Sequence, residues 1–134
     1  MDYNKLVDEA ILGRSKSYSP YSKFKVGASI LLKNGQYLNG CNVENISYGL
    51  TNCAERTVLF KMISEGYNKE DVVAMAIVAD TKNPVSPCGA CRQVMAELLN
   101  SNTVVILSNL NKDMKITSVS ELLPYVFEEI ENAN

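Results

Sequence analysis

The feature that most constrains the fold of this chain is a pair of apolar segments separated by a stretch of helical length. Residues 72–79 form a nearly continuous apolar run, which is typical of a strand covered on both faces. Residues 88–99 have the pattern of a helix, and residues 103–107 form a second apolar run. A strand–helix–strand order joins parallel neighbours in one sheet, so the sequence predicts a partly parallel sheet covered by helices.

The rest of the chain adds antiparallel strands and further helices to this centre. Alternating apolar residues predict a strand at 24–32, and the Asn34-Gly35 pair predicts a hairpin turn into a second strand at 36–42. Helices are predicted at 2–17, 53–65, 119–123 and 125–130, and a short strand at 114–117. The predicted fold is of the α/β class, a three-layer α/β/α sandwich with a mixed five-stranded sheet.

Composition places the chain among single-domain globular proteins. It has 134 residues, 46% of them hydrophobic, with no linker or repeat, so residues 1–134 are predicted to form one domain. The net charge of −2 and the pI near 5.2 argue against electrostatic binding to nucleic acid or to an anionic membrane. No apolar run is long enough to span a bilayer.

Three of the four cysteines lie in two short segments with the spacing of metal ligands. Cys53 comes at the start of one predicted helix, which Thr51 or Asn52 is expected to cap, and Cys88 and Cys91 come at the start of another. Thiolates bind Zn²⁺ well, and two cysteines separated by two residues can hold one ion. Because the chain has no histidine, three sulfurs leave one corner of a zinc tetrahedron free. A free corner is typical of a site that activates water.

The fourth cysteine, Cys41, leaves alternatives open. If Cys41 closed the zinc site, the site would be structural, since structural sites prefer four protein ligands. Four cysteines in a small secreted domain could instead form two disulfides, but the first residues lack the apolar core of a secretion signal. Cys41 lies in the period-two pattern of a predicted strand, so we expect a free thiol in the core of a cytoplasmic protein.

Glu55 and Arg56 give the predicted zinc site the groups that hydrolysis needs. Three thiolates and Zn²⁺ carry one net negative charge, which weakens the metal as an acid toward bound water. The positive helix starts and Arg56 can offset this charge. Glu55 lies two residues from a ligand, so its carboxylate can take a proton from water and pass it to a leaving group. Removal of an amino group from an amidine-like carbon uses these parts. Peptide hydrolysis could use them too, but the His-Glu-x-x-His pattern is absent.

Four segments of the chain carry a more specific signal. They are Pro20-Tyr21-Ser22-Lys23-Phe24-Lys25-Val26-Gly27-Ala28, Gly40-Cys41-Asn42-Val43-Glu44-Asn45, Cys53-Ala54-Glu55-Arg56-Thr57 and Ser86-Pro87-Cys88-Gly89-Ala90-Cys91-Arg92-Gln93. The last two fit the Cys-x-Glu and Pro-Cys-x-x-Cys elements of zinc deaminases. In order and spacing, the four together resemble the small homotetrameric cytidine deaminases over nearly the whole chain.

The resemblance implies a role for each matching residue at the metal. Cys53, Cys88 and Cys91 would bind one Zn²⁺ per subunit, and Glu55 would be the catalytic proton shuttle. From the charge of the site, and not from the resemblance, we expect Arg56 to hydrogen-bond the thiolates and draw negative charge away from the metal.

The resemblance also implies how a nucleoside is bound. Asn42 and Glu44 would hydrogen-bond the ribose hydroxyls, and Phe24 would pack against the pyrimidine ring. The backbone around Ala54 and the Ser86 carbonyl would recognise the base. The implied assembly is a homotetramer whose pockets are completed by neighbouring subunits, with Tyr48 and Phe127 as the residues that reach across an interface.

The activity implied by the family is hydrolytic deamination of cytidine and 2′-deoxycytidine in pyrimidine salvage, with release of ammonia, by a zinc-bound hydroxide. A zinc domain without enzymatic activity is the alternative from another class. A deaminase acting on nucleic acid is disfavoured because the chain has a net negative charge and its sequence shows no groove of aromatic and basic residues. A nucleotide deaminase is disfavoured because no cluster of arginine or lysine near the sugar-contact loop could bind a phosphate.

Overall fold

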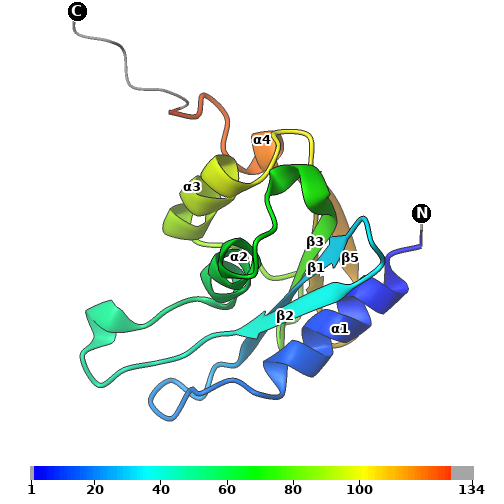
Figure 1. Ribbon diagram of the computed structural model, residues 1–134. Helices are drawn as coiled ribbons and strands as arrows, with labels where there is room; N and C mark the ends of the chain where they lie inside the picture. Colours follow the sequence, from blue (N-terminus) through cyan, green and yellow to red (C-terminus); the bar gives the residue numbers. More distant parts are fainter. Residues whose placement is uncertain (1, 128–134) are drawn as a thin grey trace, which may run out of the picture.

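The computed structural model describes residues 2–127, which form a five-stranded sheet between two layers of helices (Figure 1). The elements in chain order are α1 (Asn4–Arg14), β1 (Val26–Leu32), β2 (Tyr37–Cys41), α2 (Ala54–Ser64), β3 (Val72–Ala79), α3 (Gly89–Leu98), β4 (Val104–Asn109), β5 (Met114–Ser118) and α4 (Val119–Leu122). Two 3₁₀ turns, Tyr48–Leu50 and Lys69–Asp71, precede α2 and β3. Among these residues no helix is both long and apolar enough to cross a bilayer.

The sheet is mixed, as predicted. Its strand order is β2-β1-β3-β4-β5. The strands β3 and β4, which α3 connects, run parallel, and every other neighbouring pair is antiparallel. The strand–helix–strand unit predicted from the two apolar runs is therefore the centre of the sheet.

Two apolar layers lie on either side of the sheet. α1 covers one face, and α2, α3 and α4 cover the other (Figure 1). The residues of β3 alternate between the layers: Ala74, Ala76 and Val78 pack in the α1 layer, and Met75 and Ile77 pack in the other. β3 is thus covered on both faces, which explains its continuous apolar sequence.

Two glycines let the helices approach the strands closely. A Cβ atom on Gly27 of β1 would lie 2.0 Å from the carbonyl oxygen of Ala10 in α1. A Cβ atom on Gly40 of β2 would lie 2.9 Å from Val58 in α2 and 3.1 Å from the carbonyl oxygen of Ala54. The first turn of α2 is therefore held directly against β2.

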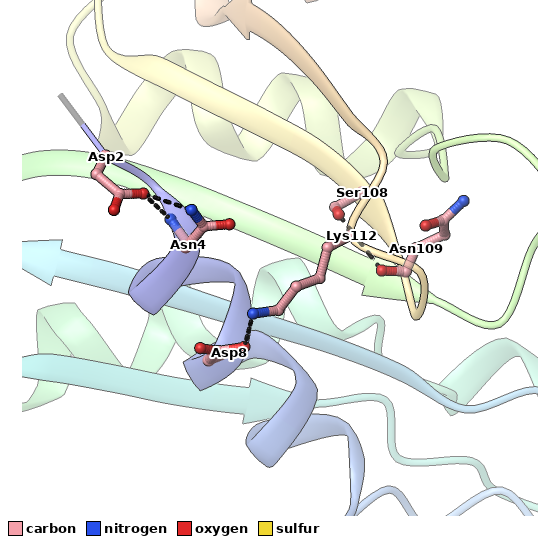
Figure 2. Close-up of polar contacts among 6 residues, drawn as sticks. All are labelled: Asp2, Asn4, Asp8, Ser108, Asn109 and Lys112. Atoms are coloured by element: carbon pink, nitrogen blue, oxygen red, sulfur yellow. Dashed lines mark hydrogen bonds and ion pairs between the residues drawn. The ribbon is translucent and has the colours of Figure 1, made fainter.

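The turn between β4 and β5 is fastened to α1. Lys112, whose φ is +64°, forms an ion pair with Asp8 (Figure 2). At the base of this turn, the Asn109 side chain donates to the carbonyl oxygen of Lys82 at 3.0 Å. The turn therefore also holds the start of the loop that follows β3.

The observed elements are shorter than predicted at several ends. α1 begins at Asn4 and ends at Arg14, and the N-cap of α2 is Cys53 itself, so the expected caps Thr51 and Asn52 were wrong. Residues 125–127 are not helical, and Tyr125 has a φ of +54°. The rest of the helix predicted at 125–130 lies outside the described residues.

Candidate metal centre and substrate pocket

The register of the sheet brings three loops to one edge. Val26, the first residue of β1, is opposite Ala79, the last residue of β3. Cys41, the last residue of β2, is opposite Gly27. The loops before β1, after β2 and after β3 consequently leave the sheet side by side, and the last two lead to α2 and α3.

A short backbone bridge draws the loop after β2 toward the start of α2. Val43 and Asn52 exchange two backbone hydrogen bonds of 3.0 and 2.9 Å. Val43 also pairs with Tyr18, because the Glu44 amide donates to the Tyr18 carbonyl oxygen at 2.8 Å. These bonds place Val43, the neighbour of Glu44, beside Asn52, the residue that precedes Cys53.

The three predicted ligands meet where the N-termini of α2 and α3 converge. Cys53 is the N-cap of α2, and Cys88 is the N-cap of α3 with Cys91 on its first turn. The sulfur of Cys88 lies 4.0 Å from that of Cys53 and 3.3 Å from that of Cys91, and all three sulfurs lie within 4.8 Å of one another. Tetrahedral zinc with Zn–S bonds of about 2.3 Å places its sulfurs about 3.8 Å apart. The cluster therefore fits one zinc ion per chain.

Cys41 does not belong to this cluster, and its predicted burial was wrong. The burial of β2 alternates so that Leu38 and Gly40 face the core, which puts Cys41 on the other side, where it is only half-buried. Its thiol donates to the carbonyl oxygen of Lys16 at 3.4 Å. All four cysteines are free, so neither a disulfide nor a four-cysteine site forms.

Hydrogen bonds within the cluster favour a thiolate at Cys53. A hydrogen bond from Cys91 and the Arg56 guanidinium together lower the pKa of Cys53 to about 5. The bond from Arg56 Nη2 to Cys53 Sγ is 3.2 Å long, so the contact expected between this arginine and a thiolate is present. The proximity of Cys53 raises the pKa of Cys91. Zinc binding would therefore release the remaining thiol protons.

Glu55 lies on the first turn of α2, beside the sulfurs. Its side chain is only 5% exposed. Burial raises the pKa of this carboxyl above its ordinary value, and the nearby Cys53 thiolate raises it further. A carboxyl that takes up a proton readily is suited to acid–base chemistry near neutral pH.

A pocket of about 300 Å³ opens in front of Glu55 and the sulfurs. Its wall contains most of the residues expected to bind substrate or metal: Phe24, Asn42, Glu44, Tyr48, Cys53, Ala54, Glu55, Ser86 and Cys88. Cys91, buried behind the others, completes the sulfur cluster. One chain therefore brings together the predicted metal, acid–base, sugar and ring contacts.

Asn42 is engaged with the protein more fully than the sequence suggested. The Asn42 side chain accepts from the amide of Val26 at 2.9 Å and from the hydroxyl of Ser17 at 2.5 Å, and it donates to the carbonyl oxygen of Phe24 at 2.8 Å. One amide hydrogen remains available for a ligand. Asn42 is thus a support of the loop that carries Phe24.

Glu44 is also buried and hydrogen-bonded. One carboxylate oxygen accepts from the backbone amides of Tyr21 at 3.0 Å and Ser22 at 3.1 Å, and the other accepts from the Ser22 hydroxyl. The Ser22 hydroxyl, followed by these amides, holds the pKa of Glu44 below its ordinary value. A carboxylate has about four acceptor sites, so Glu44 keeps acceptor capacity for a ligand.

The two residues expected to act across an interface occupy different places. Tyr48 is 67% exposed at the rim of the pocket. Phe127 is 69% exposed and lies in a separate hollow beside α3 and α4, with Lys69 and Tyr125. One chain does not bring Phe127 into the pocket that contains Glu55.

Two residues that support this pocket were not predicted. Ser22 holds Glu44, as described above. Arg92 donates to the carbonyl oxygens of Pro87 and Leu122, at 2.9 Å each, and to the Ser86 hydroxyl at 2.7 Å. Arg92 thereby fixes the loop before Cys88. Arg92 directly follows a ligand and lies in one of the four family-like segments, but neither observation indicated what its side chain contacts.

Comparisons with known proteins agree with this geometry. Residues 1–108 match the family described as the cytidine and deoxycytidylate deaminase zinc-binding region. A cytidine deaminase of Halalkalibacterium halodurans is 60% identical over 127 residues, which cover 95% of each chain. One of Sporosarcina psychrophila is 50% identical over 129 residues, covering 96% of this chain and 93% of the relative. The crystal structure of a cytidine deaminase from Burkholderia pseudomallei matches with a TM-score of 0.91 at 48% identity, covering 95% of this chain and 100% of that one.

The fold and the three-cysteine centre define a zinc-dependent hydrolytic deaminase. The chain belongs to the cytidine deaminase family, of the small bacterial type, which confirms the resemblance seen in its sequence.

Proposed function

We propose that this protein hydrolyses cytidine and 2′-deoxycytidine to uridine and 2′-deoxyuridine and releases ammonia. The observation that carries the proposal is that Glu55 and two of the clustered sulfurs, those of Cys53 and Cys88, line the same pocket as Phe24 and Glu44. Such a pocket offers hydrogen-bond acceptors for a sugar, an aromatic face for a planar base, and acid–base chemistry at its end.

The reaction replaces an exocyclic amino group by oxygen. Cys53, Cys88 and Cys91 would hold the zinc ion, which would supply a water molecule activated as a nucleophile for C4 of the cytosine ring. Glu55 takes one proton from that water and delivers it to N3. As the C4–N bond breaks, Glu55 takes the second proton of the former water from the oxygen on C4 and delivers it to the amino group, which leaves as ammonia while C4 becomes a carbonyl. The raised pKa of Glu55 keeps the carboxyl able to hold each proton between the two transfers.

The remaining pocket residues orient the nucleoside. Glu44 and the free amide hydrogen of Asn42 bind the ribose hydroxyls, and Phe24 packs against the ring. Backbone N–H groups at Ala54, on the positive end of α2, and the Ser86 carbonyl recognise the polar edge of the base.

Turnover measurements on the purified protein test this function. Loss of cytidine absorbance and release of ammonia should occur with cytidine and with 2′-deoxycytidine, and removal of zinc by a chelator should abolish both signals. Cytidine monophosphate and single-stranded DNA serve as competing substrates. Faster turnover of either competitor, or turnover that survives complete metal removal, would refute the proposal.

We further propose a homotetramer in which neighbouring subunits complete each pocket. Exposed apolar side chains near the pocket and on the C-terminal segment support this assembly: Ile46, Tyr48, Leu50 and Phe127. The mass of the particle in solution, from size-exclusion chromatography with light scattering, tests it, and a monomer of 14.8 kDa would contradict it.

We also propose that the protein acts in pyrimidine salvage in the cytoplasm. A zinc site made of three thiolates, those of Cys53, Cys88 and Cys91, supports a compartment in which thiols stay reduced. Fractionation of the source cells tests the location.

A further inference from the structure

The loop that carries Phe24 is fastened to the two predicted sugar contacts on both sides of the aromatic residue. The amide of Phe24 donates to the hydroxyl oxygen of Ser22 at 3.0 Å, and the Ser22 hydroxyl donates to Glu44. The carbonyl oxygen of Phe24 accepts from the Asn42 side chain at 2.8 Å. Phe24 is therefore connected to Glu44 through one side chain, that of Ser22.

The backbone around Ser22 depends on these bonds. Lys23 has a φ of +62°, a conformation that residues other than glycine rarely adopt. Its amide donates to the carbonyl oxygen of Ser19 at 3.1 Å, which closes a tight turn directly before Phe24. Phe24 itself is 44% exposed, so packing alone does not fix its ring. The hydrogen bonds of Ser22 and Asn42 to its amide and carbonyl hold the backbone from which the ring projects.

Glu44 is oriented by the same serine. Three of its hydrogen bonds come from the segment Tyr21–Ser22, two of them from Ser22 itself. Glu44 is 5% exposed, and both Ser22 and Glu44 line the pocket. A ligand that draws Glu44 toward a sugar hydroxyl would therefore act on the Ser22 hydroxyl and, through it, on the amide of Phe24.

We propose that Ser22 is a positioning residue that couples recognition of the sugar by Glu44 to placement of the Phe24 ring against the base. The inference rests on the proposed function of the pocket. Ser22 need not touch the reacting atoms. Through its hydroxyl, placement of the Phe24 ring depends on the contact between Glu44 and the sugar. The contact with Phe24 should therefore add little binding affinity for a pyrimidine that lacks its sugar.

Steady-state kinetics of the zinc-loaded enzyme with cytidine test the coupling. Ser22→Ala removes the hydroxyl but keeps the backbone bonds to Glu44, and we expect KM to rise about tenfold, which corresponds to one lost hydrogen bond, with kcat within about twofold of wild type. Ser22→Thr keeps the hydroxyl and should restore most of the affinity. Ser64→Ala, at the exposed end of α2, removes a serine hydroxyl far from the pocket and serves as the matched control.

A double-mutant cycle separates this role from a general effect on folding. If Ser22 acts through Glu44, Ser22→Ala should change KM little in a Glu44→Gln background, so the two effects are not additive. Additive effects, or a Ser22→Ala enzyme with the KM of wild type, would overturn the inference while leaving the proposed function intact. A wild-type enzyme that does not turn over cytidine would overturn both.

Discussion

Replacement of Arg56 by glutamine should weaken zinc binding at the three-cysteine centre. The guanidinium donates to Cys53 Sγ at 3.2 Å, and its Nε atom is buried with no hydrogen-bond partner among the described residues. Three thiolates and one Zn²⁺ ion have a net charge of −1, so a cation beside Cys53 stabilises the zinc-bound site. Glutamine keeps a polar group at this place and removes the charge.

The size of the effect follows from the one bond that is lost. A hydrogen bond to a charged group contributes a net of about 1.5–3 kcal/mol, and 1.4 kcal/mol corresponds to a tenfold change in affinity. The zinc dissociation constant should therefore rise about 10- to 100-fold, the range also found when partners of metal ligands are removed in other proteins.

Competition with a chromophoric chelator of known affinity measures this constant. Lys61→Gln, which removes the same charge from the exposed last turn of α2, is the matched control and should leave the constant unchanged. If Arg56→Gln and Lys61→Gln bind zinc within about twofold of each other, the assignment of Arg56 to charge compensation is refuted.

Three other perturbations test the supports of the pocket. Gly27→Ala would force α1 away from β1, because its Cβ would lie 2.0 Å from a helix carbonyl oxygen. Chemical denaturation should show a loss of about 3 kcal/mol in the free energy of unfolding. Gly49→Ala is the control and should change this free energy little, because its Cβ would have no atom within 4 Å. The lowered pKa of Glu44 means that its ionised form stabilises the fold above its ordinary pKa of about 4.3, and that this contribution is lost as the pH falls through the lowered value. The difference in unfolding free energy between wild type and Glu44→Gln should accordingly shrink between about pH 6 and about pH 3, and a constant difference would contradict it. Arg92→Ala removes three hydrogen bonds from the loop before Cys88 and should speed zinc loss to a chelator, whereas Gln93→Ala should lose zinc at the wild-type rate.

The sequence predicted those parts of the site that depend on local geometry. Cys88 and Cys91 are three residues apart at the start of α3, so their short spacing brings these two sulfurs together, and Cys53 at the start of α2 was recognised as a ligand from its own segment. The order of the strands follows in the same way, since the connection from β3 through α3 to β4 has few alternatives.

The remaining features depend on contacts between distant segments, which no local pattern encodes. Ser22 and Glu44 meet only because the loops before β1 and after β2 leave the sheet together. The alternation of residues in β2 correctly indicated that successive side chains face opposite sides of the sheet. It did not indicate which side buries its residues more deeply, so Cys41 was predicted to lie in the core, whereas it is only half-buried. The role of Asn42 as a support of the loop that carries Phe24 has no signal in its sequence neighbours.

The most direct test of the account measures cytidine turnover and zinc content together, in wild type and in Glu55→Ala. Because Glu55 lines the pocket but is not one of the three sulfur ligands, the variant should keep one zinc per chain and lose turnover by a factor of about 100 or more, the contribution typical of a general acid–base group. Turnover close to wild type in a zinc-loaded Glu55→Ala protein would contradict the central claim that this carboxyl moves the protons of the reaction.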